Sequence, residues 1–276
     1  MFSTRFAPSP TGQLHRGHAF SALTAHRAAR EAGGRFVLRI EDIDATRCRP
    51  RFEAAILEDL AWLGLDWETP VRRQSDHLQD YHAALEGLTA RGLTYRCFRT
   101  RREIADDIAR APHGAMETWR GEPLSAAEEA ARLAKGEAFA WRLSLDAAEQ
   151  ALGGFKTLRF FEEGLGREVQ ADPTLGGDVV LARKDVGVAY HLAVVVDDAL
   201  QAISHVIRGI DLFEATHVQR LLQALLDLPT PVYRHHALLS GPDGKRYAKR
   251  DRAQTLAELR ASGMTPVALR RELGFD

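Results

Sequence analysis

The chain has 276 residues, 45% of them hydrophobic, and its 37 lysines and arginines nearly balance its 38 aspartates and glutamates. This length allows one large or two modest domains with a sizeable core, and the balanced charge gives no global sign of a nucleic-acid partner. The two cysteines, Cys48 and Cys97, are too few for a disulfide framework. The first residues form no apolar signal segment and no apolar run could cross a membrane, so we expect a cytoplasmic protein with no membrane partner.

The first motif spans residues 5–18, which read RFAPSPTGQLHRGH. Two prolines fix the backbone around Ser9, so we expect a short strand, a rigid turn and the start of a helix. Such a turn directs free N–H groups outward and suits an anion such as phosphate. Gly17 lets a ligand approach the backbone, and His15 and His18 add donors. The stretch is a candidate nucleotide site; the alternative is a loop whose histidines only cap a helix.

The next residues predict a right-handed βαβ unit of an α/β fold. Residues 19–32 are rich in helix formers and stop at a Gly-Gly pair, and residues 36–40 read as a buried strand. Ligands in parallel sheets bind beyond the carboxyl ends of the strands. Residues 5–9 and the pair Glu41-Asp42 therefore converge on one crevice.

A carboxylate cluster, EDID at residues 41–44, leaves this second strand. It could anchor a substrate ammonium group, orient a loop through Arg47 or Arg49, or simply be solvated.

Further elements follow from periodicity and from turn residues. Tyr190 lies in the predicted hairpin at 178–191, and Arg208 lies near the end of the predicted strand at 203–209. An arginine at a strand end is ordinarily a surface or ion-pairing residue. The other expected elements are helices at 52–63, 76–91 (capped by Ser75) and 214–226, two short helices within 255–273, a small antiparallel sheet that includes 141–145 and 157–161, a hairpin at 178–191 returning to the main sheet, and a strand at 203–209.

Four sequence runs resemble the class I aminoacyl-tRNA synthetases, in the form used by the glutamyl and glutaminyl branch. They are PSPTG followed by LHRGH, RIEDID after the second predicted strand, YHLAVVVDD from Tyr190, and HVIRGIDL around Arg208. The resemblance implies a Rossmann-like, HIGH-type parallel sheet in two halves, residues 1–92 and 178–240. It also implies an inserted acceptor-type subdomain at 93–177 and a KMSKS-type loop with short C-terminal helices at 241–276.

The resemblance also assigns site residues and substrates. ATP, arriving with Mg²⁺, is expected at His15, Gly17, His18 and Lys249, of which His15, His18 and Lys249 are the catalytic set. Glu41 receives the amino group of the amino acid. Two cations, Arg5 and Arg208, then face a dicarboxylic substrate, which favours L-glutamate over glutamine. The full glutamate set is Arg5, Phe6, Ala7, Pro8, Ser9, Glu41, Tyr190 and Arg208.

Two places depart from the family pattern. Where many short relatives bind zinc through a C-x-C pair, a tyrosine and a third cysteine, Cys97 stands alone and Arg99 replaces the second cysteine. One thiol with His113 is not a credible ligand set, so we expect no zinc and no protein metal site. The arginine cluster here either forms ion pairs, contacts RNA phosphate or is solvated; its members are Arg96, Arg99, Arg101 and Arg102. In the KMSKS-type loop Arg246 replaces the first lysine and the serine is missing, whereas Lys249 is kept.

The chain contains no stretch that resembles an anticodon-binding domain. It is therefore most similar to the short paralogues of this branch, the glutamyl-queuosine tRNA(Asp) synthetases. That resemblance implies a monomer that activates glutamate without tRNA and transfers it to queuosine in the anticodon loop of tRNA(Asp). The alternatives are a truncated glutamyl-tRNA synthetase acting on the acceptor end, a small-molecule nucleotidyltransferase of the HIGH superfamily, and a non-catalytic tRNA-binding module.

Overall fold

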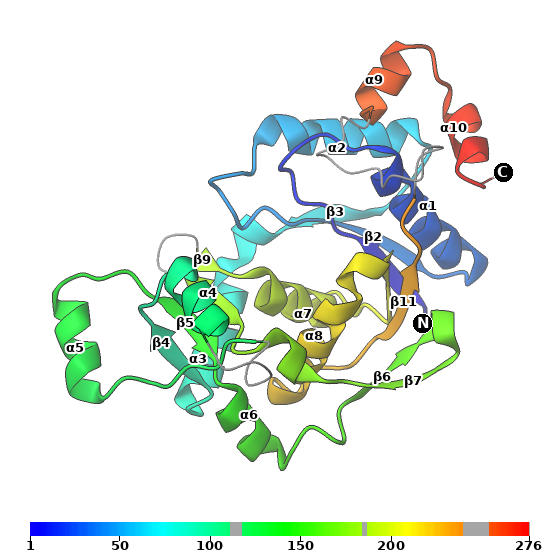
Figure 1. The fold of residues 1–276 in the computed structure, drawn as a ribbon. Coiled ribbons are helices and arrows are strands. Elements are labelled where there is room, and N and C mark those ends of the chain that lie inside the picture. The colour runs from blue at the N-terminus through cyan, green and yellow to red at the C-terminus, as the bar shows by residue number, and fades with distance from the viewer. Residues whose placement is uncertain (111–117, 184–186, 240–253, 276) are drawn as a thin grey trace.

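The structure is a computed structural model that describes residues 1–110, 118–183, 187–239 and 254–275. Its central layer is a parallel arrangement in which β2 pairs with β1 and β3, and β10 pairs with β11. Ser204 N donates to Ser3 O at 3.0 Å just before β10, so β10 lies beside β1 (Figure 1). The strands are β1 (Ser3–Phe6), β2 (Arg35–Ile40), β3 (Glu68–Arg73), β10 (His205–Gly209) and β11 (Val232–His236).

Helices cover both faces of this layer. Side chains alternate along β2, so that Leu38 joins a core with α1 and α2 while Val37 joins a second core with α3, α7 and α8. The βαβ prediction is confirmed by β1, α1 and β2, although α1 begins earlier than expected, at Arg16. The helices are α1 (Arg16–Glu31), α2 (Pro50–Trp62), α3 (Leu78–Ala90), α7 (Tyr190–Leu200) and α8 (Phe213–Leu225).

Helix α7 corrects the sequence-based expectation for Tyr190. Residues 188–191 were expected in a hairpin strand, but Tyr190 is the first residue of α7. The helix is buried among α3, α8 and the sheet, and Leu192 through Asp198 are all buried. A helix buried on most sides shows no 3.6-residue periodicity, so the sequence pattern did not indicate a helix here.

A smaller antiparallel sheet lies beside the central layer, with strand order β4-β5-β8-β9. The hairpin of β8 and β9 was expected in the main sheet, but it pairs with β5 in this one. Helix α5 projects from the edge of this lobe, on the left of Figure 1, with no buried residue. The elements are β4 (Thr94–Cys97), α4 (Arg101–Arg110), α5 (Ala126–Ala134), β5 (Ala140–Leu143), α6 (Leu145–Leu152), β8 (Val180–Arg183) and β9 (Gly187–Val188).

A second hairpin, β6 (Arg159–Glu162) and β7 (Arg167–Gln170), extends the central layer, whereas residues 157–161 were expected in the small antiparallel sheet. Strand β6 pairs in parallel with β11 through Glu162 and Tyr233, and β7 lies outside it. Sheet membership thus crosses the sequence division at 93–177, and those domain boundaries remain a prediction.

The two short helices expected within 255–273 are α9 (Leu256–Ala261) and α10 (Pro266–Glu272). Both share a core with α2. Leu256 N donates to Leu14 O at 2.9 Å, and His15 forms an isolated β-bridge with Thr255. The segment that follows residues 240–253 is therefore attached directly to the first motif.

Candidate active site

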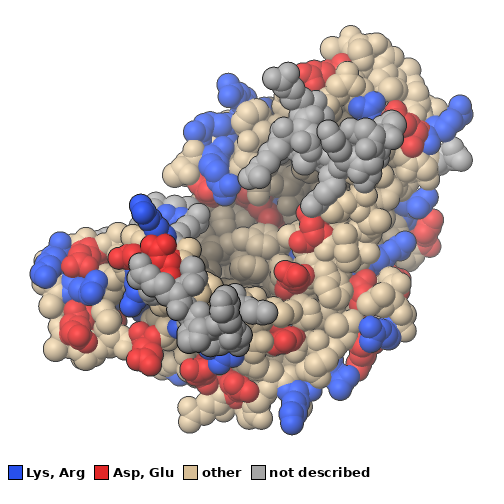
Figure 2. Space-filling view, in the orientation of Figure 1, with Lys and Arg blue, Asp and Glu red and all other residues tan. Residues whose placement is uncertain are grey.

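A cavity of about 620 Å³ opens at the carboxyl ends of β1, β2 and β10. Figure 2 shows the surface hollowed between two lobes, with acidic and basic side chains interspersed around it. Every described residue of the predicted set lines this cavity: Arg5, Phe6, Ala7, Pro8, Ser9, His15, Gly17, His18, Glu41, Tyr190 and Arg208. Lys249 lies outside the described residues. The structure thus brings the expected site together, while the role of each side chain stays a prediction.

Two strand ends close one wall of the cavity. Glu41 N donates to Pro8 O at 3.0 Å, which links the exit of β2 to the PSPTG turn. Arg49 N donates to Pro10 O at 3.0 Å and holds the far side of the same turn. The convergence of residues 5–9 with Glu41 follows from this parallel pairing.

The two histidines of the first motif cap α1 reciprocally. His15 Nδ1 accepts from Gly17 N at 3.1 Å, and His18 Nδ1 accepts from His15 N at 3.2 Å. The rings lie 3.8 Å apart between centroids. Because Nδ1 is an acceptor in both neutral rings, both protons sit on Nε2. The capping and ligand-binding interpretations are therefore compatible, since capping fixes the tautomer that donates from Nε2.

Beneath Glu41 lies a buried charge network that the sequence analysis did not assign. Arg39, fully buried in β2, contacts Glu41 at 3.1 Å, Asp198 at 2.8 Å and Asp197 at 3.6 Å. Arg5 also pairs with Asp198, at 3.1 Å. The available signal was an arginine inside the apolar strand FVLRI, because a buried charge requires partners. Arg5 thus lines the cavity with its charge already paired.

Opposing effects act on the carboxyl groups of this network. Burial raises the pKa of Glu41 above its ordinary value, although Arg39 and Arg5 oppose the shift. Burial would also raise the pKa of Asp198, but Arg5 and Arg39 outweigh it and lower that pKa. Glu41 is therefore the carboxylate of the two that takes up a proton first.

Arg208 occupies the other side of β1 and is 4% exposed. Its Nη2 donates to Thr216 Oγ1 at 2.8 Å and to Leu212 O at 3.1 Å, and its Nη1 lies 3.5 Å from Tyr190 Oη. These partners are neutral, and among the described residues Arg208 makes no salt bridge with a carboxylate. A buried guanidinium without an anion is suited to a ligand that brings one.

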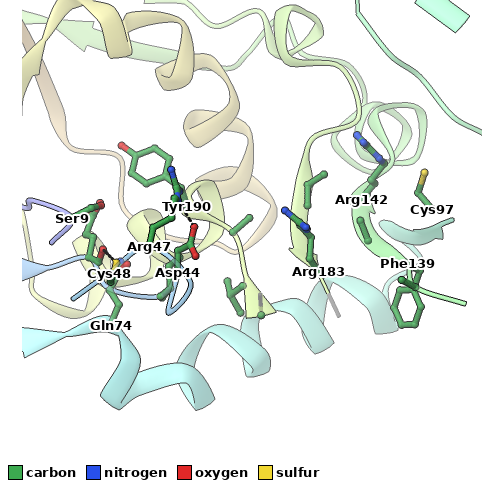
Figure 3. Close-up of a pocket in the computed structure, with 18 of the residues that line it drawn as sticks. Ser9, Asp44, Arg47, Cys48, Gln74, Cys97, Phe139, Arg142, Arg183 and Tyr190 are labelled. Atoms are coloured by element: carbon green, nitrogen blue, oxygen red, sulfur yellow. Dashed lines mark hydrogen bonds and ion pairs between the residues drawn. The ribbon is translucent and has the colours of Figure 1, made fainter. Parts of the chain in front are cut away.

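A second cavity, of about 690 Å³, adjoins the first and shares Ser9, Glu41 and Tyr190 with it. Figure 3 shows its two sides: Ser9, Asp44 and Arg47 lie in the loops that follow β1 and β2. On the other side, Arg142 and Arg183 belong to β5 and β8, and Phe139 directly precedes β5. The cavity has room for a nucleoside-sized group beside Ser9, Glu41 and Tyr190.

The place of the family's second zinc cysteine is taken by Arg99, whose guanidinium lies 5.5 Å from the Trp119 ring centroid. Cys97 is buried with Tyr95 and Ile104 in a small core of its own. Tyr95 Oη and Gly121 N both donate to Asp178 Oδ2 at 2.8 Å. Within the described ranges, no group of three His, Cys, Asp or Glu side chains could hold a metal ion.

Ser75 and the two other acids of the EDID run have structural contacts. Ser75 was expected to cap the following helix, but it lies in a 3₁₀ turn before α3 and donates from N and Oγ to Asp42, at 2.8 and 2.6 Å. Asp44 accepts from Thr46 Oγ1 and Arg47. Among the described residues, no helix combines the length and the apolarity that a membrane span requires.

A parallel sheet with its nucleotide-type turn and buried acid and arginine at the strand ends defines the catalytic domain of a class I tRNA synthetase. Residues 1–275 match the family of class I tRNA synthetases (E and Q), catalytic domain. The chain therefore belongs to that family.

Individual relatives narrow the comparison. The chain is 48% identical to the Glutamyl-Q tRNA(Asp) synthetase of Rhodobacter capsulatus, over 99% of each chain. It is 41% identical to the protein of that name from Symbiobacterium thermophilum, over 100% of this chain and 86% of the other. The glutamate-tRNA synthetase structure from Elizabethkingia anophelis superposes with a TM-score of 0.76 and 28% identity, covering 91% of this chain and 53% of that one. The present chain thus spans about half of that longer synthetase.

Proposed function

We propose that this protein activates L-glutamate with Mg-ATP, without tRNA, and then transfers it to queuosine in the anticodon loop of tRNA(Asp). The observation that carries the proposal is one cavity holding Glu41, suited to an ammonium group, and Arg208, suited to a side-chain carboxylate, on the two sides of β1. The Glutamyl-Q name of the relatives that match nearly the whole chain supports the acceptor.

In the first step the α-carboxylate of glutamate attacks the α-phosphorus of ATP, and the bond to pyrophosphate breaks in line. No covalent enzyme intermediate is needed, so positioning and electrostatics supply the catalysis. In this proposal the Nε2–H groups of His15 and His18 and the amino end of α1 bind phosphate oxygens. Support comes from His15, Gly17 and His18, which line the cavity. Magnesium enters with ATP, held chiefly by its phosphates.

Lys249 completes this set in the proposal, by steadying the phosphates as the adenylate forms. Support comes from the described flanks of its segment: Leu239 lines the cavity, and Thr255 bridges to His15. Lys249→Ala should cripple adenylate formation while RNA binding stays nearly intact. Unchanged turnover of this variant would remove the assignment.

In the second step a cyclopentenediol hydroxyl of queuosine attacks the activated carbonyl, and AMP leaves. The second cavity supports this step because it adjoins the residues proposed to bind glutamate and is lined by Phe139, Arg142 and Arg183. Aromatic rings stack on bases and arginines contact phosphates, as single-stranded RNA loops require.

The test is glutamate-dependent exchange of pyrophosphate into ATP by the purified protein without tRNA. Exchange with glutamate and not with glutamine supports the activation step, and label transfer from glutamate to queuosine-containing tRNA(Asp) tests the second. Exchange that appears only with tRNA(Glu) would instead favour a truncated glutamyl-tRNA synthetase. If no exchange occurs with or without tRNA, the result would favour a non-catalytic tRNA-binding module.

A further inference from the structure

Behind Arg208 lies a buried pair, His235 and Glu162, that the mechanism above does not use. The His235 side chain is 1% exposed and the Glu162 side chain 2%. His235 lies opposite Arg208 in the parallel pairing of β11 with β10, and Glu162 belongs to the β6–β7 hairpin, contributed by a distant part of the chain. Three segments therefore meet at one guanidinium.

The hydrogen bonds fix the tautomer of His235. Arg208 Nε can only donate, and it lies 3.2 Å from His235 Nε2, so Nε2 is the acceptor. The ring proton then sits on Nδ1 and is donated to Glu162 Oε2 at 2.7 Å. Burial, with Arg208 beside it, lowers the pKa of His235 to about 4, which keeps the ring neutral at neutral pH.

Glu162 is fixed in turn by the backbone. Its Oε1 accepts from His235 N at 3.0 Å and from Gly164 N at 3.2 Å, so only Oε2 faces the imidazole. The carboxylate therefore has one available orientation, and the tautomer of His235 follows from it.

We propose that His235, oriented by Glu162, is the positioning residue that aims the Arg208 guanidinium into the glutamate cavity and thereby sets selectivity for a side-chain carboxylate. With Nε bound to His235 and Nη2 bound to Leu212 O and Thr216 Oγ1, the remaining Nη1 edge faces the Tyr190 side of the cavity. This inference rests on the proposed function, since it gives the cavity a glutamate ligand.

The sharpest variant is Glu162→Gln. The amide oxygen keeps the two backbone donors, so the amide nitrogen must face His235 Nδ1 and donate to it. Nδ1 then becomes the acceptor, and the ring proton moves to Nε2, where it opposes Arg208 Nε–H. We expect the KM for glutamate to rise about tenfold or more, with the KM for ATP unchanged.

Two substitutions at His235 separate the halves of the arrangement. His235→Asn keeps a donor near Glu162 but loses the acceptor for Arg208, so it should reproduce the KM increase. His235→Gln keeps an acceptor at the Nε2 position, so this variant should retain most of the wild-type affinity for glutamate. The matched control is His217→Asn, a buried histidine whose Nδ1 accepts from Asp172 N, and its KM should stay within about twofold of wild type.

Nitrogen NMR of the His235 ring provides a readout that needs no activity. The wild type should show the Nδ1–H tautomer and Glu162→Gln the Nε2–H tautomer; the same tautomer in both would overturn the inference. So would a Glu162→Gln variant with wild-type glutamate KM, if Arg208→Gln abolishes exchange. A wild type without glutamate-dependent exchange would overturn the proposed function instead, and the tautomer measurement would still decide the positioning.

Discussion

The two sides of the glutamate cavity differ in how their buried charges are paired. On the Glu41 side, Arg5, Arg39 and Arg72 pair with Glu41, Asp197 and Asp198, so positive and negative groups balance within the protein. On the Arg208 side the described partners are neutral. The balanced side is a rigid platform, whereas the unbalanced side gains most from a ligand that brings a negative charge.

Arg39→Met would break the balanced side and should have the largest effect. It leaves Glu41 buried without an ion-pair partner among the described residues and removes one of the two arginines that pair with Asp198. We therefore expect a loss of about 3 to 5 kcal/mol in the free energy of unfolding, measured by urea denaturation. The control is Arg35→Met, whose exposed partner is Glu68 and which should cost under about 1 kcal/mol. Equal losses in the two variants would contradict the distinction.

Arg208→Gln tests the unbalanced side. Removing the cation should lower kcat/KM for glutamate about a hundredfold or more, because a buried charge-assisted contact to the substrate is lost. The unfolding free energy should change less than in Arg39→Met, since no carboxylate of the described structure is stranded. Pyrophosphate exchange and urea denaturation on the same samples check both statements. Unaltered kcat/KM would show that another group binds the side chain.

Acidification should affect the platform in a defined order. The pKa of Glu41 is raised and that of Asp198 is lowered, so Glu41 loses its charge first as the pH falls from neutral. The contribution of Asp198 to stability persists until the pH falls through its lowered pKa. The KM for glutamate should therefore rise about tenfold per pH unit below the pKa of Glu41, while circular dichroism still shows the folded protein. In Glu41→Gln this pH dependence should disappear; its persistence would assign it elsewhere.

Tyr190→Phe should have the smallest effect. The hydroxyl lies 3.5 Å from Arg208 Nη1, at the outer limit of a hydrogen bond, so its removal should raise the KM for glutamate about threefold or less. A larger increase would mean that Tyr190 binds the substrate directly.

Much of this site could be predicted from short motifs. The strand, turn and helix at residues 5–18 and the acid after β2 depend on neighbouring residues, and parallel pairing then fixes their meeting point. Glu162 and His235 could not be predicted in this way. They are 73 positions apart, and no local pattern shows that β6 pairs with β11. Helix α7 was hidden for a different reason, because burial on most sides removes the polar face that reveals a helix.

The β6–β7 hairpin limits how this enzyme could be rebuilt by exchange of parts. Replacing everything from β4 to β7 with a foreign module would leave β11 as an unprotected edge and remove the carboxylate behind His235. A graft confined to the connection between β4 and β5, which carries α4 and α5, would leave the central layer intact. Within the insertion, the connection between β4 and β5 can therefore be exchanged, whereas the β6–β7 hairpin must be kept.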